Sequence, residues 1–274
     1  MNEPNAATHG QLIRSAAEVY EAFFVPALFG QWPGRVLDTA QLTAGDDVLD
    51  VGCGTGILAC AAARRLNDSG SVTGIDINDG MLTIARKTSE PVTWQRGPAE
   101  HMPFPDRSFD RVVSQFALMF FADQKAGLQE MARVTRPGGT ITIATWASID
   151  QSPGYAAMVE LLQRLFGDEV ATALMAPFTL GTEDQLHDLI DKILPNATVA
   201  QHQGLARFSS IESWVHTDVR GWTLADMIDD GQYAHLLAAA KKELADFVDT
   251  NGQVRFPAPA LIATAPAPDN GCSG

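Results

Sequence analysis

A strand that runs into three closely spaced glycines and then into a helix is the feature that most limits how this chain folds. The segment reads Val48-Leu49-Asp50-Val51-Gly52-Cys53-Gly54-Thr55-Gly56-Ile57. The short apolar run before the glycines predicts a buried strand, and the apolar spacing across 55–66 predicts a helix. Glycine allows positive φ and close approach of a ligand to the backbone, and the start of a helix offers unpaired N–H groups. The segment therefore predicts a strand–turn–helix unit with a ligand at its turn, and a tight turn without a ligand is the alternative.

Strands and helices alternate over roughly the hundred residues from Asp46 to Trp146. Apolar patterning predicts these strands: 47–51, 71–75, 92–95, 109–114 and 140–146. It predicts these helices: 55–66, 79–88 and 125–134, the last stopped by Pro137-Gly138-Gly139. Such alternation is typical of an α/β fold with a doubly wound, mostly parallel sheet and helices on both faces.

The alternation stops after Trp146, and helices dominate the rest of the chain. The expected helices there are 155–166, 168–176, 183–193, 211–219, 224–229 and 233–250. Two strands are expected, over 198–208 and 254–265, and two helices at the N-terminus, over 11–30 and 35–42. We therefore predict an N-terminal helical lid (1–45), an α/β core (46–149), a helical cap with the last strands of the sheet (150–265) and a disordered tail (266–274).

An acidic residue, Asp76, ends the second predicted strand, one strand–helix–strand step after Gly52. A carboxylate at that place can accept hydrogen bonds from both hydroxyls of a ribose. NAD and S-adenosylmethionine (SAM) both carry such a ribose, and a helix N-cap is the alternative without a ligand. The glycine spacing separates the two cofactors better. A dinucleotide turn follows G-x-G-x-x-G/A, whereas this chain has G-x-G-x-G followed by Ile57.

Four segments of the block from Val48 to Trp146, taken together, resemble the class I SAM-dependent methyltransferases. The branch with the greatest similarity is that of the ubiquinone/menaquinone biosynthesis (UbiE-like) methyltransferases. The segments are Val48–Ile57, Gly74–Leu82, Gly97–Val113 and Leu128–Ile143. The resemblance implies a Rossmann-like seven-stranded sheet and SAM as the cofactor. SAM has no phosphate to clamp, which agrees with the missing third spaced glycine.

The resemblance also implies roles for individual residues. Asp50 and the turn with Gly52, Gly54, Thr55 and Gly56 would line the methionine and ribose part of SAM. Asp76 would accept the ribose hydroxyls, Ile77, Met81, Ala99 and Glu100 would lie at the adenine, and Gln115 with Phe116 would close the methionine side. The family usually has Asp where this chain has Pro98, which offers neither that carboxylate nor a backbone N–H.

The charge and composition of the chain limit the classes of partner that it is expected to bind. The formal net charge is −14, and no Lys/Arg cluster is visible, which argues against nucleic acid and anionic membranes as partners. No apolar run reaches the roughly 18 residues of a membrane span, and no signal peptide is recognised. Three cysteines give no disulfide framework, and no residue set has metal-ligand spacing. A cytoplasmic protein, monomer or homodimer, is expected.

The acceptor side of the predicted site is less specific. Tyr20 and Phe24 on the opening helix, with Phe116, are candidates to contact the substrate, and plain core packing is the alternative. His216 and Arg220 share a helix face and are weak candidates for a catalytic base and a cation, against a solvated helical face. The predicted function is methyl transfer to an O, N or C atom of a small, largely apolar metabolite. The alternatives are an NAD(P)-dependent oxidoreductase and a non-catalytic SAM-binding protein.

Overall fold

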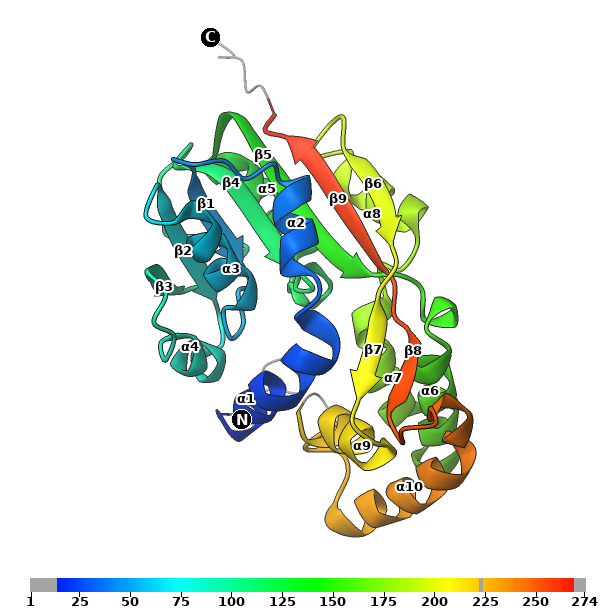
Figure 1. Cartoon of the computed structure of the whole chain (residues 1–274). Coiled ribbons are helices and arrows are strands. Elements are labelled where there is room, and N and C mark those ends of the chain that lie inside the picture. The colour runs from blue at the N-terminus through cyan, green and yellow to red at the C-terminus, as the bar shows by residue number, and fades with distance from the viewer. Residues whose placement is uncertain (1–13, 222–223, 269–274) are drawn as a thin grey trace, which may run out of the picture.

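The computed structural model describes residues 14–221 and 224–268. The start of the predicted N-terminal lid and most of the predicted tail (266–274) lie outside these residues. The described chain forms a twisted sheet flanked by helices, with a group of helices attached beyond one end of the strands (Figure 1).

The central sheet has seven strands in the order β3-β2-β1-β4-β5-β9-β6. Strands β3, β2, β1, β4 and β5 are parallel to their neighbours, and β9 is antiparallel to both β5 and β6. Their bounds are β1 Asp47–Val51, β2 Ser71–Asp76, β3 Val92–Arg96, β4 Phe109–Gln115, β5 Thr135–Trp146, β6 Thr198–His202 and β9 Ala260–Pro266. The predicted doubly wound, mostly parallel sheet of seven strands is confirmed.

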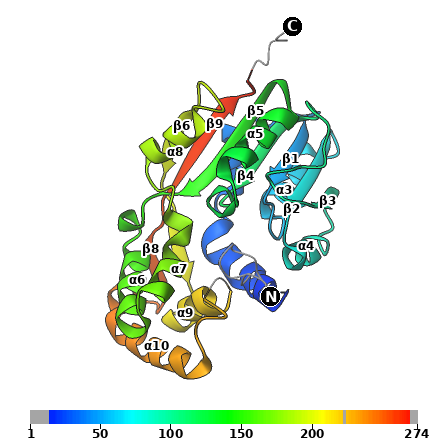
Figure 2. The same ribbon diagram turned by 180° about the vertical axis from the view of Figure 1, so that it is seen from behind.

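Helices cover both faces of this sheet. Helices α2 (Pro33–Thr39) and α3 (Ile57–Leu66) lie in front of it in Figure 1, and α5 (Gln124–Val134) and α8 (Glu183–Ile190) come to the front when the molecule is turned (Figure 2). Helix α4 (Asp79–Ala85) packs beside β2 and β3. The central strands are buried on both faces, which explains their continuous apolar runs.

Two predicted strands are each broken in the middle. Residues 198–208 form β6 and then β7 (Leu205–Phe208), and residues 254–265 form β8 (Val254–Pro257) and then β9. Strands β7 and β8 pair with each other in a separate two-stranded sheet. At the break, a Cβ on Gly204 would lie 2.3 Å from the ring of Trp32, and Ala258 N–H donates to Gly204 O over 2.9 Å. The paired strands therefore leave the main sheet together, a bend set by a tertiary contact.

The cap, as we call it from here, is built around β7 and β8. It comprises α6 (Pro153–Phe166), α7 (Asp168–Met175), η5 (Ala176–Phe178), α9 (Ile211–Arg220), α10 (Asp230–Glu243) and η6 (Ala245–Phe247). The fully buried ring of Trp214 lies at its centre, in contact with the rings of Tyr155, Phe208, Phe247 and Phe256. Aromatic pairs of this kind supply most of the apolar area that holds such a small unit together.

Several element boundaries differ from the prediction. The expected helix 224–229 is a turn, because the Asp229 side chain accepts the N–H of Gln232 and starts α10 at Asp230. Helix α10 ends at Glu243, short of the expected 250. Strand β5 begins at Thr135, so Pro137-Gly138-Gly139 lies inside the strand, where the pairing register with β4 shifts.

The N-terminal segment lies between the carboxyl ends of the strands and the cap (Figure 1). The expected single helix is α1 (Arg14–Val19) followed by a π-helix, η2 (Tyr20–Phe29). Pro26 lies inside η2 and has no N–H to donate, which agrees with the wider turn. Gln31 then exchanges two hydrogen bonds with the backbone of Leu205, of 2.7 and 3.0 Å, so its amide extends the pairing of β7.

Candidate functional site

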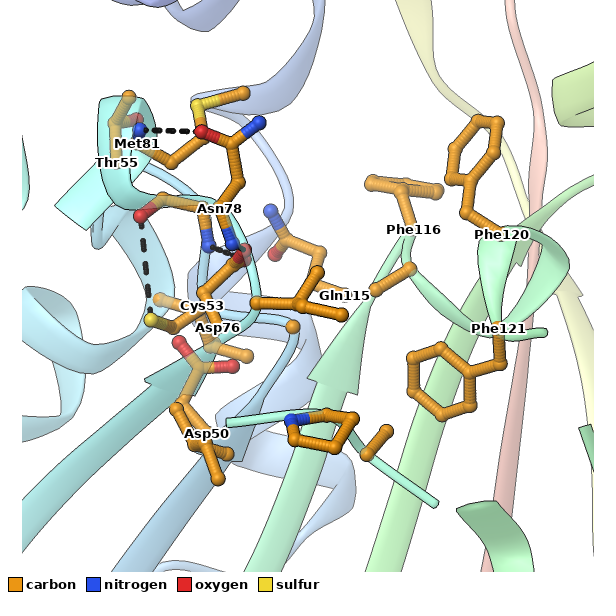
Figure 3. Close-up of a pocket in the computed structure, with 18 of the residues that line it drawn as sticks. Asp50, Cys53, Thr55, Asp76, Asn78, Met81, Gln115, Phe116, Phe120 and Phe121 are labelled. Atoms are coloured by element: carbon orange, nitrogen blue, oxygen red, sulfur yellow. Dashed lines mark hydrogen bonds between the residues drawn. The ribbon is translucent and has the colours of Figure 1, made fainter. Parts of the chain in front are cut away.

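A pocket opens at the carboxyl ends of β1, β2 and β4, where the glycine turn, the acid after β2 and the end of β4 meet. Figure 3 shows Asp50 and Asp76 on one side of it and Phe116, Phe120 and Phe121 on the other. In parallel sheets the loops beyond the carboxyl ends of strands form the ligand crevice. The lining residues are Tyr20, Asp50, Gly52–Thr55, Ile57, Leu58, Ile75–Asn78, Met81, Gly97–Glu100, Gln115–Ala117 and Phe120–Ala122.

The turn after β1 needs its glycines. Gly52, Gly54 and Gly56 all have positive φ, of 69°, 55° and 93°. A Cβ on Gly52 would also lie 2.4 Å from the Cβ of Ala117, so the turn packs directly on the loop after β4. The G-x-G-x-G pattern is thus explained by backbone geometry at the pocket wall.

Asp76 ends β2 and is held by the backbone of two loops. Its Oδ2 accepts the N–H of Gly54 over 2.8 Å, and its Oδ1 accepts the N–H of Asn78 over 2.8 Å. Burial raises the pKa of this carboxyl, and these backbone donors, with that of Ile77, oppose the rise. The acid is therefore fixed in orientation at the floor of the pocket.

Asp50 lies on β1, two residues before the glycine turn, and is 1% exposed. Its Oδ2 accepts the N–H of Ala59 over 3.0 Å, and its Oδ1 has no hydrogen-bond partner among the described residues. Burial raises the pKa of Asp50 to about 8, opposed by the Ala59 N–H and increased by the charge of Asp76. A cationic or hydrogen-bond-donating ligand would relieve this buried acid.

The end of β4 supplies the opposite wall. Phe116 has a φ of 57°, a conformation that is costly for a bulky residue and is concentrated at functional sites. Its ring stacks on that of Trp146 with centroids 3.8 Å apart. Just before it, Gln115 Oε1 is buried without a hydrogen-bond partner in the described chain, as is Thr55 Oγ1 across the pocket.

The third wall is the start of α4 and the loop after β3. The side chain of Asn78 caps α4 by accepting the N–H of Met81 over 3.1 Å, and Ile77 is 46% exposed at the pocket. The loop that carries Pro98, Ala99 and Glu100 is held from α5. There, Glu130 accepts the N–H of Met102 over 2.7 Å.

Arg133 completes that attachment. It pairs with Glu130 and donates to the carbonyls of Phe104 and Met102 over 2.8 and 3.1 Å. It also pairs with Asp106 at 2.8 Å. One arginine thus organises the loop that forms the third wall.

The structure brings together most of the predicted cofactor residues but not all. Asp50, Gly52, Gly54, Thr55, Asp76, Ile77, Met81, Ala99, Glu100 and Gln115 all line the pocket, together with Tyr20 and Phe116. Gly56 faces a neighbouring cleft instead. Phe24 is 1% exposed and packs between the rings of Tyr20 and Phe29, so it is a core residue.

The two candidate catalytic residues do not reach this pocket. The ring of His216 packs edge-on against Phe23, with centroids 5.2 Å apart. Arg220 pairs with Asp230 at 2.6 Å and lies over the ring of Tyr233. Arg220 therefore joins two helices of the cap, and His216 joins the cap to the N-terminal segment.

Sequence reasoning missed several lining residues. Asn78 had a usable signal, because Asn directly before a helix is a favoured N-cap. Phe120 and Phe121 follow β4 in the apolar run after Phe116. Because this run is apolar throughout, its spacing does not show which of its side chains face the pocket. Cys53 is a buried free cysteine that also lines the pocket.

Among the described residues, the side chains that line the pocket carry three acids, Asp50, Asp76 and Glu100, and no Lys, Arg or His. A phosphate-bearing ligand would meet repulsion there, whereas a cation would be attracted. The buried acceptor atoms of Asp50 and Gln115 call for donors such as an ammonium group. The chemistry of this donor set fits SAM, which carries a sulfonium, an ammonium and two ribose hydroxyls.

Comparison with known proteins agrees with this geometry. Residues 49–143 match the family model described as a methyltransferase domain. Over this segment the predicted resemblance to class I methyltransferases of the UbiE-like branch is confirmed. The domain includes β1 to most of β5, and therefore every wall of the pocket except the N-terminal segment.

Two curated relatives show the degree of similarity. The demethylmenaquinone methyltransferase of Symbiobacterium thermophilum is 35% identical over 138 residues, which is 47% of this chain and 55% of the relative. The ubiquinone/menaquinone biosynthesis C-methyltransferase UbiE of Stenotrophomonas maltophilia is 36% identical over 149 residues, 51% of this chain and 59% of the relative. The chain thus spans little more than half the length of the curated relatives it matches.

Solved structures extend the likeness of the fold beyond the methyltransferase domain. The YcgJ protein from Bacillus subtilis has a TM-score of 0.58 at 23% identity, covering 87% of this chain and 99% of that one. Phosphoethanolamine N-methyltransferase 2 of Haemonchus contortus, solved with SAM, has a TM-score of 0.59 at 18% identity, covering 93% and 58%. At these identities the likeness shows the fold alone.

None of the helices in the described residues combines the length and apolar composition needed to cross a membrane. Within the same residues, no three His, Cys, Asp or Glu side chains are grouped so as to hold a metal ion.

Proposed function

We propose that this chain transfers a methyl group from SAM to an O, N or C atom of a small, largely apolar metabolite. The observation that carries the proposal is the acidic pocket at the glycine turn, whose buried, partnerless acceptor atoms suit the donors of SAM. The methyltransferase domain and the names of the curated relatives support the same activity.

In this proposal, different side chains of the pocket contact different parts of the cofactor. Asp76 would accept the ribose hydroxyls, and Asp50 with Gln115 would hold the methionine end. Ile77 and Met81 would cover one face of the adenine. Pro98, Ala99 and Glu100 would lie at its edge, without the carboxylate that the family usually places at Pro98.

Bound SAM supplies an electrophilic methyl group on a sulfonium, and in-line transfer of that group requires chiefly positioning and exclusion of water. The protein provides both. Backbone N–H groups fix Asp76, and the rings of Tyr20, Phe116 and Phe120 form an apolar wall beside the pocket. A dedicated catalytic base is not required when the acceptor is itself nucleophilic.

The curated relatives are named as methyltransferases of menaquinone and ubiquinone biosynthesis. These names support the proposal that the acceptor is a small aromatic or quinone-like molecule. In this proposal the acceptor lies between the aromatic wall of the pocket and the cap. The cap and the N-terminal segment would then act together as its cover.

Calorimetry with SAM, its demethylated product and NAD(H), followed by an acceptor screen with the same protein, tests the proposal. We expect both sulfur-containing nucleosides to bind and NAD(H) not to bind. Binding of NAD(H) without SAM would favour an oxidoreductase. Binding of SAM without turnover on any acceptor would favour a non-catalytic SAM-binding protein.

A further inference from the structure

Asp50 brings an incompletely bonded carboxyl group to the wall of the cofactor pocket (Figure 3). Only 1% of the residue is exposed, yet it lines the pocket. Its Oδ2 accepts the N–H of Ala59, whereas its Oδ1 has no hydrogen-bond partner among the described residues. A ligand in the pocket therefore lies within reach of a buried acid that has one oxygen left to bond.

The surroundings of Asp50 offer no positive charge. Its neighbours across the sheet are Gly74 of β2 and Val113 of β4, which are both uncharged. In the described chain, no Lys, Arg or His is among the lining residues of the pocket. The titratable side chains around it come from β2, η2, the glycine turn and α3, and they are Asp76, Tyr20, Cys53 and Cys60.

These neighbours favour the neutral form of Asp50 while the pocket is free of ligand. Burial raises the pKa of the phenol and of both thiols, so these three groups are uncharged near neutral pH. Asp76 is a second acid, and two carboxylates that share a site repel each other when both are ionised. Burial raises the pKa of Asp50 to about 8, opposed by the Ala59 N–H and increased by the charge of Asp76. The ligand-free protein therefore holds a proton on Asp50 near neutral pH.

An ammonium group reverses this preference. A cation in contact with a carboxyl group favours its ionised form, and a hydrogen bond between two charged groups is stronger than one between neutral groups. A neutral donor, such as a hydroxyl, brings no charge and leaves the proton on the acid. SAM and its demethylated product both carry an ammonium group at the end that the proposed function assigns to Asp50.

We propose that Asp50 makes the pocket select nucleosides that carry an ammonium group, and that it loses a proton to solvent when such a group binds. The inference rests on the proposed function, since it concerns the cofactor of that site. On binding, the O–H bond of the Asp50 carboxyl breaks, its electron pair stays on the oxygen, and the proton passes to water or buffer. The ammonium keeps all its hydrogens, so one positive charge enters the pocket as another leaves it.

Calorimetry in two buffers with different ionisation enthalpies counts the protons released on binding. The ligands are S-adenosylhomocysteine, S-adenosyl-3-thiopropylamine, which keeps the ammonium but lacks the carboxylate, and 5′-methylthioadenosine, which has neither group. At pH 6 we expect each of the first two to release about one proton more than the third. The third ligand reports protons released by other groups, such as Asp76 on contact with the ribose.

The affinity should depend on pH in the same way. Binding that releases a proton becomes stronger as the pH rises towards the pKa of the free acid. Between pH 6 and pH 7, the affinity for S-adenosylhomocysteine should therefore rise about tenfold more than the affinity for 5′-methylthioadenosine.

Asp50→Asn keeps the shape of the side chain but cannot titrate, so both the extra proton and the pH dependence should disappear. Asp79→Asn removes an exposed acid that is not among the lining residues of the pocket, and it should keep both. The proposal is overturned if the wild type releases no proton with S-adenosylhomocysteine at pH 6, or as many with 5′-methylthioadenosine. It is also overturned if Asp50→Asn releases as many as the wild type. The wild-type measurement decides alone should Asp50→Asn not fold.

Failure of the proposed function gives a different result, because neither SAM nor S-adenosylhomocysteine would then bind at any pH. Binding of S-adenosylhomocysteine without the extra proton would leave the methyltransferase proposal intact and refute only the proton release from Asp50.

Discussion

The backbone N–H of Gly54 donates a hydrogen bond to Oδ2 of Asp76 over 2.8 Å, which joins the turn after β1 to the acid at the end of β2. The two residues are far apart in sequence and lie together because β1 and β2 are adjacent parallel strands. Asp76 therefore both fixes the turn and remains at the floor of the pocket.

Replacement of Asp76 by Ala should weaken SAM binding by about 1–3 kcal/mol, because the ribose hydroxyls lose a charged acceptor. Calorimetry measures this loss. Asp79→Ala is the matched control, since Asp79 is exposed, pairs within the described residues with the exposed Arg96 at 3.2 Å, and is not among the lining residues of the pocket. An unchanged affinity in Asp76→Ala would remove that residue from the site.

Asp50 should make the stability of the ligand-free protein depend on pH. Its pKa is about 8 in the folded protein against an ordinary 3.8, so between these values the folded state holds a proton that the unfolded state has released. The free energy of unfolding then falls as pH rises through this window, by at most about 1.4 kcal/mol per pH unit for this group. In Asp50→Asn this group no longer titrates, so its contribution to the decrease in unfolding free energy with rising pH disappears.

Thermal unfolding of both proteins from pH 4 to pH 9 checks that prediction. The Tm advantage of Asp50→Asn should grow up to about pH 8 and then level off. Asp68→Asn, on an exposed loop acid, makes the same change of charge and should track the wild type. A constant difference across the pH range would show that Asp50 is ionised in the folded protein.

Substitution of Gly56 by Ala should destabilise the protein more than the backbone conformation alone explains. A Cβ there would lie 2.4 Å from the ring of Trp94, at a φ of 93°. Gly45 has nearly the same φ, 92°, with nothing within 4 Å of its Cβ position, so Gly45→Ala isolates the backbone cost of about 1–2 kcal/mol. Chemical denaturation of both variants gives the comparison, and equal losses would show that Trp94 moves aside freely.

Arg133→Met should loosen the loop that carries Ala99 and Glu100. The arginine is partly exposed, but its hydrogen bonds to two backbone carbonyls have no replacement, and we expect a loss of about 1–3 kcal/mol in unfolding free energy. SAM affinity should fall as well, since the loop is no longer held in place. Arg164→Met breaks an exposed ion pair with Glu243 in the cap and should cost less than about 1 kcal/mol. Equal effects of the two variants would contradict the structural role of Arg133.

Local sequence patterns predict the α/β core and most of the residues of the pocket. The alternation of strands and helices is visible in the local spacing of apolar residues. The glycines at 52, 54 and 56 indicate a turn with positive φ, which glycine adopts most readily. Asp50 and Asp76 were predictable as well, because each belongs to the carboxyl end of its strand and parallel strands bring those ends together.

The arrangement of the chain after Trp146 depends instead on long-range contacts. The break between β6 and β7 depends on the contact of Gly204 with Trp32, a residue far away in sequence, and no local pattern encodes it. The same holds for His216 and Arg220, which share the predicted helix face but contact Phe23 and Asp230. Asp218 lies in the predicted helix 211–219, and the spacing of that helix does not show that its side chain is buried, because the packing of α9 in the cap decides this. Local spacing sets secondary structure, whereas the choice of partner for a side chain is made by long-range packing.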